Sequence, residues 1–161
     1  MASIQSILAI GALVIFSFVS LLFNSSWMQT SSLEIEDKVY LTAFSLADDL
    51  IEEMKQKAFD EKTIDFQAIN KNQLTPYDQL TYEGEVWPFF DDIDDYNNYN
   101  KEVDAPHAEG YHIHCDVCYC DQNGNELNTQ EYYKKVTITV ASDYLRDSFQ
   151  MYFIFSLHSK N

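Results

Sequence analysis

The sequence predicts an α+β protein in which a long N-terminal α-helix, half apolar and half amphipathic, packs on a small C-terminal antiparallel β-sheet. Three observations predict this: an uncharged apolar run near the N-terminus, a helical repeat of apolar residues after it, and alternating β-branched runs nearer the C-terminus. We divide the 161 residues into an apolar helix (1–26), an amphipathic helix (27–60) and a globular head (61–161).

The apolar run is long enough to cross a membrane. No residue from Ile7 to Phe23 is charged, and with Ile4 the run reaches roughly the 20 residues that span a bilayer as a helix. A cleaved signal peptide would have a basic start and a small-x-small cleavage site, and this run has neither. An ordinary anchor would also carry flanking basic residues, whose absence before the run is explained if a basic leader is removed and Met1 is the mature terminus.

The second part of the helix is predicted by its apolar spacing. Apolar residues recur at i, i+4, i+7 and i+8 from Val39 to Ala58, which marks one face of a helix. Because no Gly or Pro occurs between Gly11 and Pro76, we expect one helix to about residue 59, with residues 24–26 as the only plausible break. The residues expected to pack on the sheet are Val39, Ala43, Leu46, Leu50, Ile51 and Met54.

The head divides into a loop region and a sheet. Residues 61–110 are rich in Asp, Asn, Pro and Gly, which favours loops and turns. Residues 111–158 hold three runs typical of strands, and Asn123-Gly124 is a good hairpin turn between the first two. We therefore expect an antiparallel meander of three or four strands over 111–158, with its apolar face on the helix.

The charge of the chain limits its partners. Twenty-six acidic residues stand against ten basic ones, a net charge of −16, and the first acidic residue is Glu34. Such a charge argues against binding to nucleic acid or to anionic lipid head groups. It suits an exposed surface and leaves cation binding open.

The predicted plan, and three segments within it, resemble type IV pilins and pseudopilins. "SLADDLIEEMKQKAFDE" (45–61), "FDDIDDYNNY" (90–99) and "YYKKVTITV" (132–140) resemble pilin-like proteins of the mannose-sensitive haemagglutinin type. The resemblance implies an inner-membrane precursor that a prepilin peptidase cleaves and that assembly machinery draws into a helical homopolymer at the cell surface. The implied filament core comprises Ile4, Gln5, Ile7, Leu8, Ile10, Leu13, Val14, Phe16, Phe18, Leu21 and Leu22.

One position departs from the family pattern. Pilins usually carry a glutamate at the fifth mature position, thought to pair with the terminal amine of a neighbouring subunit. If Met1 is the mature terminus, this chain has Gln5 there. The neutral amide is less costly to bury than a carboxylate and can still accept a hydrogen bond from an ammonium group, without the charge attraction.

Two groups of residues are candidates for metal binding, although no cofactor is expected. His112 and His114 share one face of a regular strand and could form half of a transition-metal site. The acidic loop offers carboxylates to calcium at spacings that differ from an EF-hand. Its candidate ligands are Asp91, Asp92, Asp94 and Asp95.

The three cysteines offer a second kind of chemistry. Export favours a disulfide, and the odd number allows a link between subunits. Cys118 and Cys120 share a strand face near the upper limit of bridging distance, whereas Cys115 faces the other side. Idle buried thiols are the alternative.

No catalytic arrangement is evident, so we expect a structural protein and not an enzyme. The sequence lacks a Gly-rich phosphate loop and a nucleophile elbow. Two alternatives stay open beside the major filament subunit. One is a minor pseudopilin of a secretion system, and the other is a membrane-anchored exported module that binds metal or uses its thiols.

Overall fold

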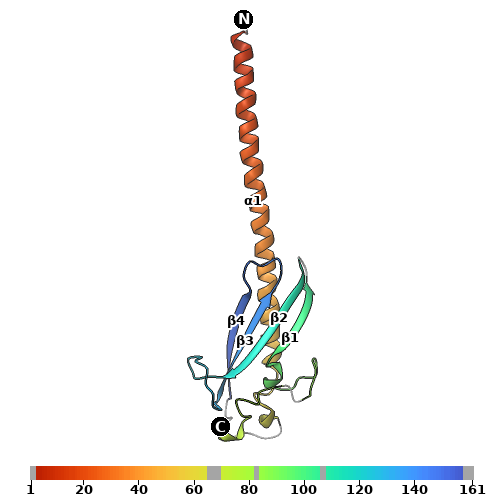
Figure 1. Ribbon diagram of the computed structural model, residues 1–161, viewed down its shortest axis with the longest axis vertical. Coiled ribbons are helices and arrows are strands. Elements are labelled where there is room, and N and C mark those ends of the chain that lie inside the picture. The colour runs from red at the N-terminus through yellow and green to blue at the C-terminus, as the bar shows by residue number, and fades with distance from the viewer. Residues whose placement is uncertain (1–2, 65–69, 82–83, 106–107, 158–161) are drawn as a thin grey trace. The chain divides into compact units, whose positions relative to one another are not determined.

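The protein has one long helix followed by a four-stranded sheet (Figure 1). The computed structural model describes residues 3–64, 70–81, 84–105 and 108–157. The elements are α1 (Ile4–Met54), the 3₁₀ turns η1 (Glu61–Thr63), η2 (Lys71–Gln73) and η3 (Asp94–Tyr96), and the strands β1 (Tyr99–Ala105), β2 (Ala108–Tyr119), β3 (Tyr133–Ala141) and β4 (Phe149–Ser156). This confirms the predicted α+β layout of a long N-terminal apolar helix and a small antiparallel sheet.

The chain divides into two compact units, Met1–Lys38 and Val39–Asn161, which we describe separately. In the N-terminal unit, α1 passes through residues 24–26 without the break that the sequence allowed. The hydroxyl of Thr30 donates to the carbonyl oxygen of Ser26 at 3.0 Å, a side-chain bond within the same helix.

In the C-terminal unit, α1 ends at Met54, so the prediction of a helix to about residue 59 was too long. The cause is backbone pairing with a distant loop. The amide of Ala58 donates to the carbonyl of Asp91 at 3.0 Å, and the amide of Ile93 donates back to Ala58 at 3.1 Å. The ammonium of Lys57 also donates to the carbonyl of Phe90 at 2.5 Å. These bonds replace helical ones, so the chain leaves the helix without Gly or Pro.

The sheet is a meander in the order β1-β2-β3-β4, with every pair antiparallel. Tyr99 pairs with Cys115, Cys115 with Ile138, and Ile138 with Met151, so one row of side chains crosses the sheet. The sheet begins at Tyr99, and its predicted start at residue 111 was wrong. β1 (YNKEVDA) has weak strand propensity, but it is an edge strand that β2 orders by pairing. Residue 158, the predicted end of the sheet, lies outside the described residues.

The predicted Asn123-Gly124 turn is present, but it does not join β2 to β3 directly. The amide of Gly124 (φ +82°) donates to the carbonyl of Asp121 at 3.0 Å. The carboxylate of Asp121 accepts from the amides of Asn123 and Asn125. The turn links Cys120 to Glu126 through an isolated bridge, and β3 starts only at Tyr133.

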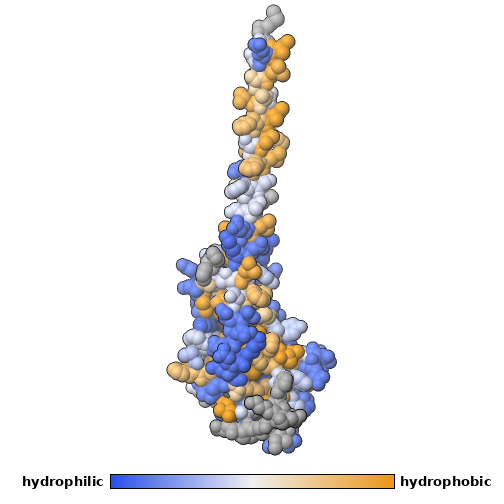
Figure 2. Space-filling view, turned by 180° about the vertical axis from the view of Figure 1, so that it is seen from behind, coloured by the Kyte–Doolittle hydropathy of each residue, from blue (hydrophilic) through white to orange (hydrophobic). Residues whose placement is uncertain are grey.

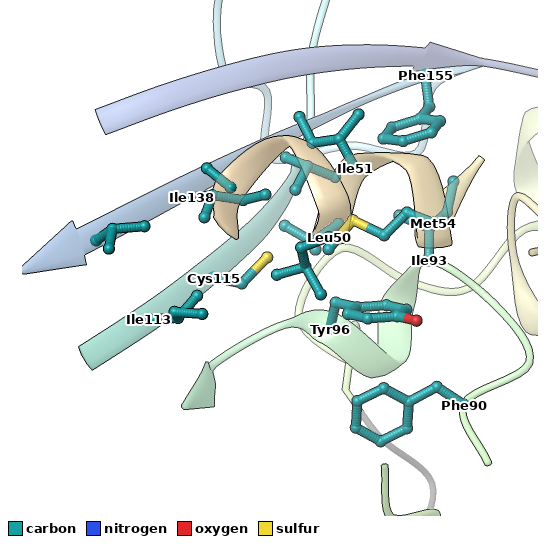
Figure 3. Close-up of a cluster of buried hydrophobic side chains, with 14 of the residues drawn as sticks. Leu50, Ile51, Met54, Phe90, Ile93, Tyr96, Ile113, Cys115, Ile138 and Phe155 are labelled. Carbon is teal, nitrogen blue, oxygen red and sulfur yellow. The ribbon is translucent and has the colours of Figure 1, made fainter. Parts of the chain in front are cut away.

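The core of the C-terminal unit lies between the last turns of α1 and the sheet (Figure 3). The helix contributes Leu50, Ile51 and Met54 to it, and the sheet contributes Ile113, Cys115, Ile138 and their neighbours. Of the residues expected to pack on the sheet, Val39, Ala43, Leu50, Ile51 and Met54 are buried in this core, and Leu46 packs against it. Burying a large aliphatic side chain stabilises the fold by roughly 1.5–3 kcal/mol, so this stripe holds the unit together.

Candidate functional site

The apolar stretch of α1 is exposed along its whole length in the N-terminal unit (Figure 2). The exposed fraction of its large apolar residues runs from 56% at Leu22 to 78% at Ile4. The stretch is long and apolar enough to cross a membrane, and none of it is buried within the described residues. The exposed set includes the expected filament-core residues Ile4, Gln5, Ile7, Leu8, Ile10, Leu13, Val14, Phe16, Phe18, Leu21 and Leu22.

The four aspartates proposed as calcium ligands do not converge on one point. They close their own loop instead, because Asp95 accepts from the amides of Asp91 and Asp92 at 3.0 and 3.3 Å. Asp92 in turn accepts from the amides of Asp94 and Asp95 at 2.7 and 3.1 Å. Asp92, Asp94 and Asp95 are buried. The four carboxylates therefore have different roles: Asp92 and Asp95 cap backbone amides, and Asp94 pairs with Lys134.

A smaller acidic group joins part of that loop to a residue that we did not single out. Carboxylate oxygens of Glu85, Asp91 and Asp95 lie within 4.8 Å of one another, which makes this the group of described residues able to offer three ligands to a cation. Partial burial, followed by the charges of Asp95 and Asp91, raises the pKa of Glu85. Glu85 lies in a turn-rich segment with no periodic pattern, so the sequence gives no signal for it.

The two strand histidines point outward from β2. One ring nitrogen of His114 is 2.9 Å from Oδ1 of Asn100, and the other is 3.1 Å from Oδ2 of Asp116. His112 is exposed, and the register places Glu102 opposite it. The pair does share one strand face, but His114 is held by polar neighbours on both sides.

All three cysteines are free thiols. Cys115 lies on the buried face of β2, and Cys118 lies on the other face, where its Sγ donates to the carbonyl of Lys135 at 3.8 Å. Cys120 follows the end of β2 and is buried, so Cys118 and Cys120 do not form an exposed pair. Burial raises the pKa of Cys115 and Cys118, and that of Cys120 to about 11. These thiols are therefore protonated and weakly nucleophilic near neutral pH.

A buried ion cluster that the sequence interpretation missed lies inside the C-terminal unit. Lys134 is completely buried, and its ammonium is 2.5 Å from Oδ1 of Asp94 and 2.8 Å from Oδ2 of Asp60. It also donates to the carbonyl of Phe59 at 2.8 Å. The signal was available, because Lys134 shares the inward alternation of Val136, Ile138 and Val140 in β3.

The two carboxylates of this cluster have different surroundings. Asp60 accepts from the amide of Lys62, from the amide and hydroxyl of Thr75, and from the hydroxyl of Tyr119. Burial opposes ionisation of Asp60, but the charge and hydrogen bond of Lys134 and the backbone amides of Lys62 and Thr75 together lower its pKa. Asp60 is therefore a firmly held carboxylate.

In contrast to Asp60, Asp94 and its neighbour Asp92 have raised pKa values. Burial, only partly offset by Lys134, raises the pKa of Asp94 to about 7. Burial and the charge of Asp94 raise the pKa of Asp92 to about 8. Within the described parts of the chain, the second carboxyl oxygens of both residues are buried without a hydrogen-bond partner. The cluster and its neighbour Asp92 thus combine one fixed anion with two carboxyl groups that take up protons near neutral pH.

No protein-family model, curated protein or solved structure matches the chain. Two features of the chain itself therefore indicate its function. One is an exposed apolar helix of membrane-spanning length, and the other is a folded, strongly acidic unit with a buried ion cluster.

Proposed function

We propose that the chain is a structural subunit of an extracellular type IV pilus-like filament that polymerises through its apolar N-terminal helix. One observation carries the proposal: the apolar stretch of α1 is nowhere buried by the described chain, although it holds most of the large aliphatic residues of the N-terminal unit. A surface of this kind needs lipid or other copies of the helix around it.

The same helix can be covered first by lipid and later by other copies of itself. In a bilayer its backbone polar groups are satisfied within the helix, so the precursor is stable as a membrane anchor. Outside the bilayer, packing against identical helices removes the apolar surface from water. Burying about 1,000 Å² per subunit at about 25 cal/mol/Å² gives tens of kcal/mol before entropy losses. A head-to-tail contact that does not close on itself produces a helical fibre.

Assembly in this way assigns a role to the N-terminal turn. Gln5 is exposed on the first turn of α1 and carries a neutral amide. If Met1 is the mature terminus, the carbonyl oxygen of Gln5 accepts a hydrogen bond in the filament from the terminal ammonium of a neighbour, at the position where pilins usually offer a carboxylate. The inner-membrane assembly machinery and the prepilin peptidase belong to this proposal as its expected partners.

The thiol-based alternative is less well supported by the site. A thiol module needs accessible thiolates, whereas burial keeps Cys115 and Cys120 protonated and only Cys118 is partly exposed. A minor pseudopilin uses the same features as the filament subunit and differs in copy number.

Electron microscopy of material sheared from the native cell surface tests the proposal. We expect uniform thin filaments that contain this chain, and mass spectrometry of the same fraction should identify the mature N-terminal residue. A Leu13→Arg chain should give no filaments, whereas the matched Leu41→Arg chain, altered at an exposed position of the C-terminal unit, should retain them. A chain that stays a detergent-requiring monomer, absent from every sheared filament, would overturn the proposal for a major subunit.

A further inference from the structure

The structure holds a lysine amine against a carboxyl group in a core without access to water. The ammonium of Lys134 lies 2.5 Å from Oδ1 of Asp94, and the side chains are 0% and 3% exposed. We propose that these two side chains condense into an intramolecular isopeptide bond, a covalent cross-link between β3 and the turn η3. This inference is independent of the filament proposal, because it depends only on the C-terminal unit.

Asp94 is the reacting carboxyl because Asp60 is committed elsewhere. Both oxygens of Asp60 accept hydrogen bonds from Thr75, and one also accepts from Tyr119, so its negative charge is fixed in place. Asp94 has no such set of donors. Its Oδ1 meets Lys134, and its Oδ2 is buried without a partner among the described residues. A carboxyl group that few donors stabilise as an anion is the better electrophile.

The surroundings favour the attack. The nitrogen of Lys134 lies 4.6 Å from the ring centre of Phe59 and 5.2 Å from that of Tyr119, so two aromatic rings close the site. Low polarity disfavours a buried ammonium and carboxylate relative to the neutral amine and acid. Holding the two reacting groups in contact replaces a bimolecular encounter, an advantage worth effective molarities of about 10⁵ M or more in well-oriented systems.

The step balances without another reactant. The ammonium of Lys134 passes one proton to the carboxylate of Asp94, and the neutral amine attacks the carboxyl carbon. The new C–N bond forms as the C–O bond breaks, and the leaving hydroxyl takes the second proton from nitrogen and departs as water.

The product suits the site. Condensation removes one positive and one negative charge from the core, while the Asp60 carboxylate keeps its hydrogen bonds to Thr75 and Tyr119. The cross-link ties residue 94 to residue 134, and closing a loop of that length restricts the unfolded chain as a disulfide would. The covalent bond does not depend on the redox state of the surroundings.

Peptide mapping by mass spectrometry tests the proposal on the purified, folded full chain after prolonged incubation at neutral pH. We expect a branched peptide that joins the segments carrying Asp94 and Lys134, lighter than their sum by one water, about 18 Da. Trypsin should fail to cleave after Lys134. Fragmentation should place the branch at these two side chains, which separates it from dehydration within one peptide.

Two variants provide controls. In Asp94→Ala the branched peptide should disappear and cleavage after Lys134 should return. In Lys135→Met, which alters the neighbouring lysine on the opposite face of β3, the branched peptide should persist. Unmodified Lys134 in all of the folded protein would overturn the proposal, and so would a branch from Lys134 to Asp60.

Discussion

The two units of the chain depart from the usual distribution of residues in opposite ways. The N-terminal unit exposes apolar side chains, such as Leu13 at 65%, whereas the C-terminal unit buries the charged groups Lys134 and Asp60 completely. The buried charges find their partners inside the same unit. The exposed apolar side chains have no such cover among the described residues.

The two parts of α1 differ in how their apolar residues are arranged around the helix. Near the N-terminus, apolar residues surround α1, as in a membrane span or a filament core. From Val39 they form one stripe, and that stripe is buried. Changes in the first part should therefore alter insertion or assembly, and changes in the second part should alter the free energy of unfolding.

Removing the buried cation should have the largest effect on stability. In Lys134→Met, Asp60 and Asp94 lose their shared positive partner in the core, so relative to the parent chain before any condensation we expect the free energy of unfolding to fall by about 3–5 kcal/mol. Urea titrations of the detergent-solubilised chain, followed by circular dichroism, measure it. The control is Lys135→Met, whose partner Glu126 is 66% exposed, and there we expect a loss of at most about 1 kcal/mol. Equal losses in the two variants would contradict the assignment.

A charge in the exposed apolar stretch should have the next largest effect. Leu13→Arg places a charge near the middle of the uncharged run, which costs about 2.5–3.5 kcal/mol of insertion free energy at the centre of a membrane helix. A glycosylation-reporter insertion assay on the full chain measures the change. Leu41→Arg, at a position that is 64% exposed in the C-terminal unit, should leave insertion unchanged. A Leu13→Arg chain that inserts as well as the parent would argue against a membrane role for the stretch.

Much of the fold could be predicted from the sequence because regular patterns mark regular elements. The stripe from Val39 to Met54 and the β-branched run of β3 both lie where their periodicity placed them. β1 was missed because YNKEVDA gains its strand conformation from pairing with β2 and not from its own propensity. The end of α1 was missed for a similar reason, since a bridge from Ala58 to Asp92 replaces the last helical turn.

The site residues were harder to predict. Alternation along β3 points Lys134 inward, but a lysine at such a position is usually exposed, and its partners Asp60 and Asp94 lie 74 and 40 residues away in the sequence. The acidic loop was recognised by composition, which cannot tell a carboxylate that caps backbone amides from one that faces solvent. Asp92 is of the first kind.

A change of pH should alter the stability of the C-terminal unit through its buried carboxyl groups. Burial and the charge of Asp94 raise the pKa of Asp92 to about 8, although Lys134 opposes this. The folded state therefore binds this proton more tightly than the unfolded chain, whose aspartates titrate near pH ~4. The stabilisation is complete below pH ~4 and is lost as the pH rises through about 8, with a slope of at most about 1.4 kcal/mol per pH unit.

The Asp92→Asn variant isolates this contribution. Its carbonyl oxygen can still accept from the amides of Asp94 and Asp95, but the side chain no longer titrates. Urea titrations at pH values from 5 to 8 should show stability falling with pH in the parent and falling less steeply in the variant. In chains in which Asp94 has not condensed with Lys134, Asp94, whose pKa is raised to about 7, should supply the remaining slope. Parallel pH profiles for the two chains would show that Asp92 does not hold a proton in the folded state.

The smallest effect gives the most direct comparison of the two parts of α1. Ile51→Val and Ile7→Val each remove one methylene group from an isoleucine of the same helix, but Ile51 is 2% exposed and Ile7 is 61% exposed. We expect Ile51→Val to lower the free energy of unfolding by about 0.5–1.5 kcal/mol, because the removed group leaves a small cavity in the core. Ile7→Val leaves no cavity in the isolated chain, so its unfolding free energy in detergent should stay within about 0.5 kcal/mol of the parent.

The order of the two effects should reverse in assembled filaments, where Ile7 lies in the proposed core. Resistance of filaments to dissociation by detergent should then fall for Ile7→Val and stay near the parent value for Ile51→Val, and equal resistance of the two would place Ile7 outside the subunit contacts.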